Sequence, residues 1–243
     1  MPAPARVVLW VVALAALSVS CGGTGLFRQY EYEEEIFLSL DGSATMYVSA
    51  SLESLNVLRG AAFDTRAARA DRDAVRDFFT APGVRVMAVS QSRRSGRRFV
   101  HVRMAVDDVR KLASAPPFAW SSYRFDRVGD QYIFEQTVAG TPVKDSAGAG
   151  WNGREVVAFR LHLPSKIEFH NTKRDIGRGN ILLWEQPLSD RLRGVPLTLE
   201  ARMQTQSILY RTLWLFGFTF LAVAFVFAAV IWWVLRRGRP AEA

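Results

Sequence analysis

Residues 213–235 limit most strongly what this chain can fold into. They form 23 consecutive positions without a charge, and Thr219 is the only polar side chain among them. At about 1.5 Å of rise per residue, a helix of this length is roughly 34 Å long, enough to cross a hydrocarbon core of about 30 Å. The core helix of a soluble protein seldom runs this far without a polar face. We therefore expect one transmembrane helix over 213–235.

The flanks of this stretch predict its orientation. Trp214 lies near one end and Trp232 near the other, as expected for the two interfacial belts of a membrane. Arg236, Arg237 and Arg239 follow the apolar run directly. Because positively charged residues favour the cytoplasmic side, residues 236–243 are expected to form a short basic cytoplasmic tail. The rest of the mature chain is then extracytoplasmic, in the cell envelope.

The N-terminus has the pattern of a secretory signal. Arg6 precedes an apolar run over 7–17, which is too short to span a membrane, and small residues follow up to Cys21. Residues 1–20 are therefore predicted to be a signal peptide. Three outcomes are open: acylation of Cys21 as in a bacterial lipoprotein, ordinary cleavage before Cys21, and an uncleaved anchor. Ser18 stands where a lipoprotein signal usually has leucine.

Composition restricts what the remaining 21–206 segment can be. It has room for one ordinary domain, and its apolar residues are spread widely enough to form a core. The net charge of +8 arises about half from Arg6, Arg211 and the C-terminal tail, so it is no argument for nucleic-acid binding. The single cysteine excludes an internal disulfide and a multi-cysteine metal site.

Alternating apolar residues predict an α+β domain that is rich in antiparallel strands. Asp41-Gly42 supplies the turn of the clearest hairpin. One helix is expected over 65–79 with Asp64 as its N-cap, and a short one over 107–113, ended by Pro116-Pro117. Residues 140–150 are expected to form a loop. The predicted strands are 36–40, 45–52, 84–89, 99–106, 120–127, 131–138, 157–163, 180–185 and 195–203.

Two charged clusters could have a function but have simpler explanations. The acidic residues Glu31, Glu33, Glu34 and Glu35 could work as paired carboxylates, yet a solvated, charged strand edge is the expected arrangement. The arginines of 93–98 could contact phosphate or lipid headgroups, but a solvated hairpin tip is favoured because basic turns are common and screened by salt.

No group of residues in the sequence supports catalysis. His101, His162 and His170 have no histidine or cysteine at ligand spacing, so neither a metal nor another cofactor is expected. The sequence has no Gly-x-Ser-x-Gly or Ser-x-x-Lys motif of a hydrolase. Ser165 and Lys166 are adjacent on a predicted strand and would point to opposite faces. We expect a protein that is not an enzyme.

A loop with glycines and basic side chains is the candidate anion or headgroup site. It contains Lys173, Arg174 and Arg178, and backbone N–H groups of such a loop can cradle a phosphate. No helix follows to add its dipole, and Gly179 also suits a plain hairpin connection. The plain turn is favoured.

The order of several short motifs resembles the LppM-type domain of bacterial envelope lipoproteins. The motifs are Leu40-Asp41-Gly42-Ser43, Leu163-Pro164-Ser165-Lys166-Ile167, His170-Asn171, Gly179-Asn180 and Leu183-Trp184, after a candidate lipoprotein cysteine. Ser165 replaces the glycine of the family, and residues 59–139 contain no matching motif. The resemblance implies an extracytoplasmic α+β domain without known catalysis that is associated with envelope lipids. The predicted function is therefore a membrane-anchored envelope protein that binds a lipid or membrane component. The alternatives are an assembly subunit that binds another membrane protein and, less favoured, a hydrolase.

Overall fold

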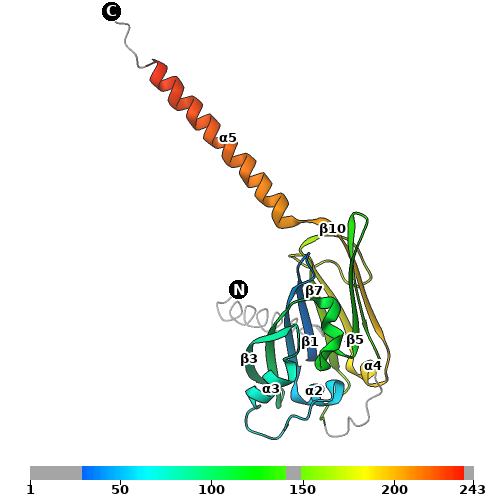
Figure 1. Ribbon diagram of the computed structural model, residues 1–243. Coiled ribbons are helices and arrows are strands. Elements are labelled where there is room, and N and C mark those ends of the chain that lie inside the picture. The colour runs from blue at the N-terminus through cyan, green and yellow to red at the C-terminus, as the bar shows by residue number, and fades with distance from the viewer. Residues whose placement is uncertain (1–28, 141–148, 238–243) are drawn as a thin grey trace, which may run out of the picture.

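The computed structural model describes residues 29–140 and 149–237 of the chain. In these residues, two β-sheets pack face to face and a long helix leaves the domain at one end (Figure 1). The prediction of an α+β, mainly antiparallel domain followed by an apolar C-terminal helix is confirmed. Cys21 and residues 141–148 of the predicted loop lie outside the described residues.

Sheet A has six strands in the order β3-β4-β2-β1-β7-β9. All neighbours are antiparallel except β1 and β7, which run parallel with Phe37 opposite His162. A parallel pair needs a long crossover, and the chain between β1 and β7 provides it. The strands are β1 (Gln29–Leu38), β2 (Ala44–Ser51), β3 (Val84–Arg94), β4 (Arg97–Val106), β7 (Glu155–His162) and β9 (Ile181–Pro187).

Sheet B has four antiparallel strands in the order β5-β6-β10-β8. They are β5 (Ser121–Val128), β6 (Gln131–Val138), β8 (Ser165–His170) and β10 (Leu197–Ser207). Alternation along β8 places Ser165 in the interior and Lys166 in solvent, so the prediction that these two residues point to opposite faces is confirmed.

The β1–β2 hairpin forms where Asp41-Gly42 predicted it. The backbone N–H of Ser39 donates to the carbonyl of Ser43 at 2.9 Å, and the Asp41 carboxylate accepts from the backbone N–H of Ser43 at 2.9 Å. Gly42 has a φ of 90°, a conformation that favours glycine. This local chemistry fixes the pairing of β1 with β2.

Two helices differ from the sequence prediction. Helix α2 (Leu52–Arg59) was not predicted, although Ser51 caps its N-terminus and Gly60 ends it with a φ of 68°. Helix α3 covers only Arg72–Phe79 and is capped by Asp71, so the predicted helix over 65–79 is wrong in its first half. Asp64 accepts from the backbone N–H of Arg66 and caps no helix.

The reason for the shorter α3 lies in side chains of sheet A. The amide of Gln91 bonds both the N–H and the carbonyl of Ala70, at 3.0 and 2.9 Å. Arg98 donates to the carbonyls of Thr65 and Arg66. Residues 65–70 therefore satisfy part of their backbone through tertiary contacts instead of helical hydrogen bonds.

Three short elements complete the domain. The helix predicted over 107–113 is a 3-10 helix, Val109–Ser114. Pro116 begins a second 3-10 helix, Pro116–Phe118, because proline is tolerated at the first helical position. Helix α4 (Leu188–Leu192) joins β9 to β10.

The core lies between the sheets and beneath α2 and α3. Val75 and Phe79 of α3 and Leu52 and Leu55 of α2 join the same buried cluster as the inward side chains of the strands. The helices therefore lie on the inner side of sheet A, beside sheet B. On the opposite, outer face of sheet A, the side chains of Phe37 and Tyr47 are exposed.

Helix α5 (Ile208–Arg237) begins directly after β10 and projects away from the domain (Figure 1). An 18-residue stretch within its 30 residues has a mean hydropathy of 2.5, and the helix is long and apolar enough to cross a membrane. It contains the whole predicted span of 213–235. Arg236 and Arg237 lie over the rings of Trp232 and Trp233 at its C-terminal end.

Candidate functional site

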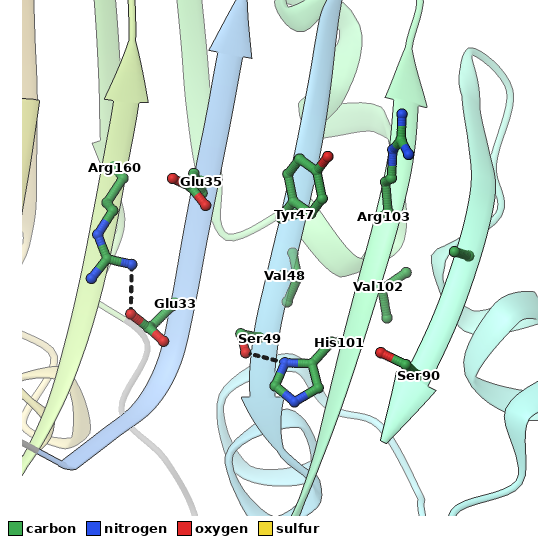
Figure 2. A pocket seen from close by; sticks show the side chains of 11 residues that line it. Glu33, Glu35, Tyr47, Val48, Ser49, Ser90, His101, Val102, Arg103 and Arg160 are labelled. Atoms are coloured by element: carbon green, nitrogen blue, oxygen red, sulfur yellow. Dashed lines mark hydrogen bonds and ion pairs between the residues drawn. The ribbon is translucent and has the colours of Figure 1, made fainter. Parts of the chain in front are cut away.

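The outer face of sheet A is hollowed into a groove of about 400 Å³ across β3, β4, β2, β1 and β7. Figure 2 shows its side chains standing in rows on the neighbouring strands. Each row comes from the alternate residues of one strand, because successive side chains of a strand point to opposite faces. The lining residues are Glu33, Glu35, Tyr47, Val48, Ser49, Ala88, Ser90, His101, Val102, Arg103 and Arg160.

The acidic cluster of β1 is not the solvated strand edge that the sequence predicted. β1 lies inside sheet A between β2 and β7, and the side chains of Glu31 and Glu34 are buried. All four glutamates have a cationic or histidine partner. The pairs are Glu31 with Arg97 at 2.8 Å, Glu33 with Arg160 at 2.7 Å, Glu34 with Arg59 at 3.3 Å and Glu35 with His162 at 2.6 Å.

Alternation along β1 divides these glutamates between the two sides of the sheet. Glu33 and Glu35 point to the groove, where Figure 2 shows the Arg160–Glu33 ion pair. The hydrogen bond with His162 lowers the pKa of Glu35 below its usual value. Phe37 stacks on the His162 ring at 3.8 Å and meets Tyr47 edge-on at 5.6 Å. The groove therefore has one wall of hydrogen-bonded carboxylates and exposed aromatic rings.

His101 lies on the groove floor between two hydroxyl groups. Its Nδ1 is 2.5 Å from the Ser49 Oγ, the contact drawn in Figure 2, and its Nε2 is 2.8 Å from the Ser92 Oγ. Burial and the nearby charge of Arg94 lower the pKa of His101, so the imidazole is neutral at pH 7. Both of these hydrogen bonds go to serines, whereas a carboxylate orients the histidine of a Ser-His-Asp triad.

Two arginines line the groove, Arg103 and Arg160. Among the described residues, Arg103 has no carboxylate partner. It is exposed on β4, and its guanidinium lies 5.9 Å from the ring of Tyr47. Arg160, the other arginine in the lining, is already paired with Glu33. The groove thus offers one available guanidinium next to an exposed aromatic ring and serine hydroxyls.

A polar cluster lies on the other side of β1, between the two sheets. The Glu34 carboxylate accepts from Tyr32 Oη at 2.9 Å, Tyr123 Oη at 3.1 Å and Gln136 Nε2 at 2.8 Å. Arg59 pairs with the same carboxylate, and burial lowers the Arg59 pKa. Burial also raises the pKa of Tyr32 well above its usual value. These groups bond one another and so join the two sheets, while Nε and Nη1 of Arg59 are buried without a hydrogen-bond partner.

The second buried glutamate ties down the chain before β7. Glu31 bonds Arg97 and accepts from Trp151 Nε1 at 3.2 Å. Arg97 also donates to the carbonyl of Gly150 at 3.0 Å. Burial raises the pKa of Glu31. The basic turn of residues 93–98 is therefore only partly the solvated tip that was expected, since Arg97 and Arg98 hold other segments of the domain.

The candidate anion loop joins β8 of sheet B to β9 of sheet A, so it is no hairpin. Lys173, Arg174 and Arg178 are all exposed, and Arg174 is paired with Glu185 at 2.5 Å. Gly179 and Asn180 have φ values of 82° and 57°, and β9 follows, not a helix. The structure does not bring Lys173, Arg174 and Arg178 together with the groove. Nothing in it tests anion binding by this loop.

The histidines do not gather at one place. His170 ends β8 on sheet B, away from His101 and His162 on sheet A. Within the described residues, no group of three histidine, cysteine, aspartate or glutamate side chains could hold a metal ion.

Comparisons with known proteins add little to this geometry. No family model and no curated protein matches the chain. Among solved structures, the folded domain of the LppM protein of Mycobacterium tuberculosis, determined by NMR, is similar with 18% sequence identity. The alignment covers 75% of this chain and 95% of that domain, with a TM-score of 0.41. The resemblance seen in the motifs is therefore matched only by a weak likeness of fold, which carries nothing about ligand or activity.

Proposed function

We propose that this chain is a membrane-anchored protein of the bacterial cell envelope whose extracytoplasmic domain binds the polar headgroup of a membrane lipid in the groove of sheet A. Helix α5 supplies the anchor, because it is long and apolar enough to cross the membrane. The observation that carries the proposal is Arg103, a groove cation without a carboxylate partner in the described structure.

The chemistry of the groove favours a phosphate-containing headgroup. A guanidinium presents a fork of N–H donors that matches phosphate oxygens. The Ser49 and Ser90 hydroxyls can complete the contacts, while the Tyr47 ring can cover an apolar part of the ligand. Glu33 and Glu35 repel an anion less than free carboxylates would, because Arg160 and His162 already bond them.

We propose further that the domain is not an enzyme. The Ser49–His101 contact is the arrangement that comes nearest to a catalytic pair, but both serines bonded to His101 lie on regular strands. A nucleophile of an acyl-transfer enzyme also needs N–H donors directed at a developing oxyanion. Ser49 lies on β2 inside sheet A, where the backbone N–H groups are bonded to the neighbouring strands.

The test is the lipid content of the full chain purified in a mild non-ionic detergent, measured by mass spectrometry of the extract. The groove variant carries Tyr47→Ala and Arg103→Ala. The control carries Phe169→Ala and Arg202→Ala, which removes a matching pair from sheet B, an exposed aromatic ring with an arginine 4.9 Å from its centroid. Wild type and control should retain a phospholipid that the groove variant loses several-fold.

Equal retention by all three proteins would overturn the proposed site, and no retained lipid in any of them would overturn lipid binding. A titration of the delipidated full chain with inorganic phosphate distinguishes a lipid headgroup from free phosphate as the ligand. Phosphate binding as tight as lipid binding would identify free phosphate as the ligand.

An assembly role is the second candidate, because Phe37, Tyr47 and Met87 of sheet A strands are 39%, 37% and 52% exposed. Exposed apolar side chains of this kind also suit a partner protein. A membrane protein that co-purifies with wild type and with the Phe169 and Arg202 control, but not with the groove variant, would support this candidate.

A further inference from the structure

We infer that the end of the domain from which α5 leaves rests in the headgroup layer of the membrane that α5 spans. The contact surface, here called the membrane end, consists of the Pro164–Lys166 corner, the loop residues Ile176 and Arg178, and Val128 at the β5–β6 turn. This inference does not depend on the ligand of the groove.

The first argument is the short distance between β10 and the apolar part of α5. Five residues, 208–212, separate Ser207 from the uncharged stretch that begins at Leu213. At about 1.5 Å per residue they rise only about 7.5 Å. Each headgroup layer is about 5–8 Å thick, so the end of β10 lies at its outer limit. Tyr210 and Trp214, whose rings are 6.1 Å apart, mark this level as aromatic residues do at a membrane interface.

The second argument is that hydrogen bonds hold the start of α5 to the domain. The backbone N–H of Ile208 donates to the carbonyl of Pro164 at 3.0 Å, and the Ser207 hydroxyl donates to the same oxygen at 3.3 Å. The N–H of Leu209 donates to the Ser207 Oγ at 3.2 Å. With no linker between β10 and α5, the domain cannot move freely away from the bilayer.

The third argument is the position of two loops beside this junction. The Asn180 side chain donates to the carbonyl of Ser165 at 2.6 Å, and Gly177 bridges to Ile181. These contacts place the 176–180 turn next to Pro164 and hence next to Ile208. The β5–β6 hairpin reaches the same end of the molecule, because Gln131 pairs with Gln204 near the end of β10 (Figure 1).

The side chains of these loops suit an interface between water and hydrocarbon. Ile176, before the 177–181 bridge, and Val128, at the end of β5, are 43% and 52% exposed. Lys166 and Arg178 are exposed close to the junction and can bind lipid phosphates. The opposite end of sheet A carries the β3–β4 turn, since Phe99 pairs with Ser51 and Val106 pairs with Ala44 at the two ends of the same ladder. Arg93, beside that turn, should not reach the membrane.

Spin labels on the full chain in phospholipid nanodiscs test the inference. Single cysteines replace Ile176, Val128 or Arg93 in a Cys21→Ser background, all at exposed positions. Collision rates with molecular oxygen, which enters lipid, and with a water-soluble nickel chelate are measured for each label. Labels at 176 and 128 should collide with the chelate several-fold less often than the label at 93, without losing collisions with oxygen.

Equal chelate access at all three positions would overturn the inference. So would labels at 176 and 128 that are shielded from both reagents, because that result indicates contact with protein and not with lipid.

Discussion

Arg59 and Glu34 form an ion pair whose side chains are 1% and 0% exposed. The pair lies between the two sheets with Tyr32, Tyr123 and Gln136 around it. A charge can be kept in such a place only when its partner and its hydrogen bonds remain.

We predict that Arg59→Met lowers the free energy of unfolding by about 3–5 kcal/mol, because it leaves the Glu34 carboxylate buried without its cation. Urea unfolding of the full chain in detergent, followed by tryptophan fluorescence, measures the change. Arg124→Met is the control, since Arg124 pairs with Asp126 and Glu135 in solvent and its loss should have little effect. A loss of stability for Arg59→Met no larger than that of the control would contradict this account.

At the scale of elements, the segments after β6 and after α4 can cross closely only because residue 140 is a glycine. Gly140 follows β6 and passes against Gly194, which follows α4; a Cβ on Gly140 would lie 1.6 Å from the Gly194 carbonyl oxygen. The buried Arg191 of α4 fixes the crossing, because its guanidinium donates to the carbonyls of Val138 and Ala139 at 3.3 and 3.2 Å. Burial and the charge of Arg59 lower the pKa of Arg191 to about 10.

Gly140→Ala should therefore force the two backbones apart and cost about 1–3 kcal/mol, the usual range for overpacking. Gly217→Ala in α5 is the matched control, because nothing lies within 4 Å of a Cβ at that position. Thermal unfolding of both variants, followed by the near-ultraviolet circular dichroism of the domain, measures the difference. A melting temperature of Gly140→Ala that equals that of the control would refute the close crossing.

The elements that the sequence predicted well are those that local chemistry determines. The β1–β2 hairpin follows from Asp41-Gly42, and α5 follows from its uninterrupted apolar stretch. The position of β1 inside the sheet could not be predicted, because its pairing with β7 joins Gln29 to Glu155 across the length of the domain. Without that pairing, four glutamates near the start of the domain resemble a protected strand edge.

The groove was missed for the same reason. Its side chains come from five strands, and only the register of β2, β1 and β7 brings Tyr47, Glu35 and Arg160 into one row. The residues that face one another across the groove lie on different strands, so no short sequence motif contains two of them. The capping residues Ser51 and Asp71 were the sequence signals for the starts of α2 and α3. Each accepts a hydrogen bond from the backbone N–H three residues further along the chain.

At the scale of the whole molecule, the two ends of the domain face in opposite directions. Gln29 begins β1 at the end of the sheet opposite to α5, since Gln29 pairs with Glu155 while Phe37 pairs with His162. The eight residue-to-residue steps from Cys21 to Gln29 span at most about 29 Å. Standing upright, β1 alone would raise Gln29 about 30 Å above the membrane end, which even a fully extended linker only just reaches.

Acylation of Cys21, which remains a prediction, would therefore tilt the domain toward the membrane plane. Labelled fatty acid should enter the wild-type protein and not Cys21→Ser. In nanodiscs, a label at position 93 should lose collisions with the nickel chelate in the acylated protein relative to the Cys21→Ser protein. An acylated protein with unchanged access at position 93 would show that the domain stands upright, which contradicts the predicted tilt.

The position of the domain relative to the membrane underlies both the groove proposal and the membrane end. Protease added to intact spheroplasts, with an epitope tag after Ala243, tests it most directly. The account predicts that the protease removes the domain up to the start of α5 and leaves a small tagged fragment that contains α5 and the basic tail. A full-length chain that survives in intact spheroplasts and is digested only after lysis would contradict the extracytoplasmic placement.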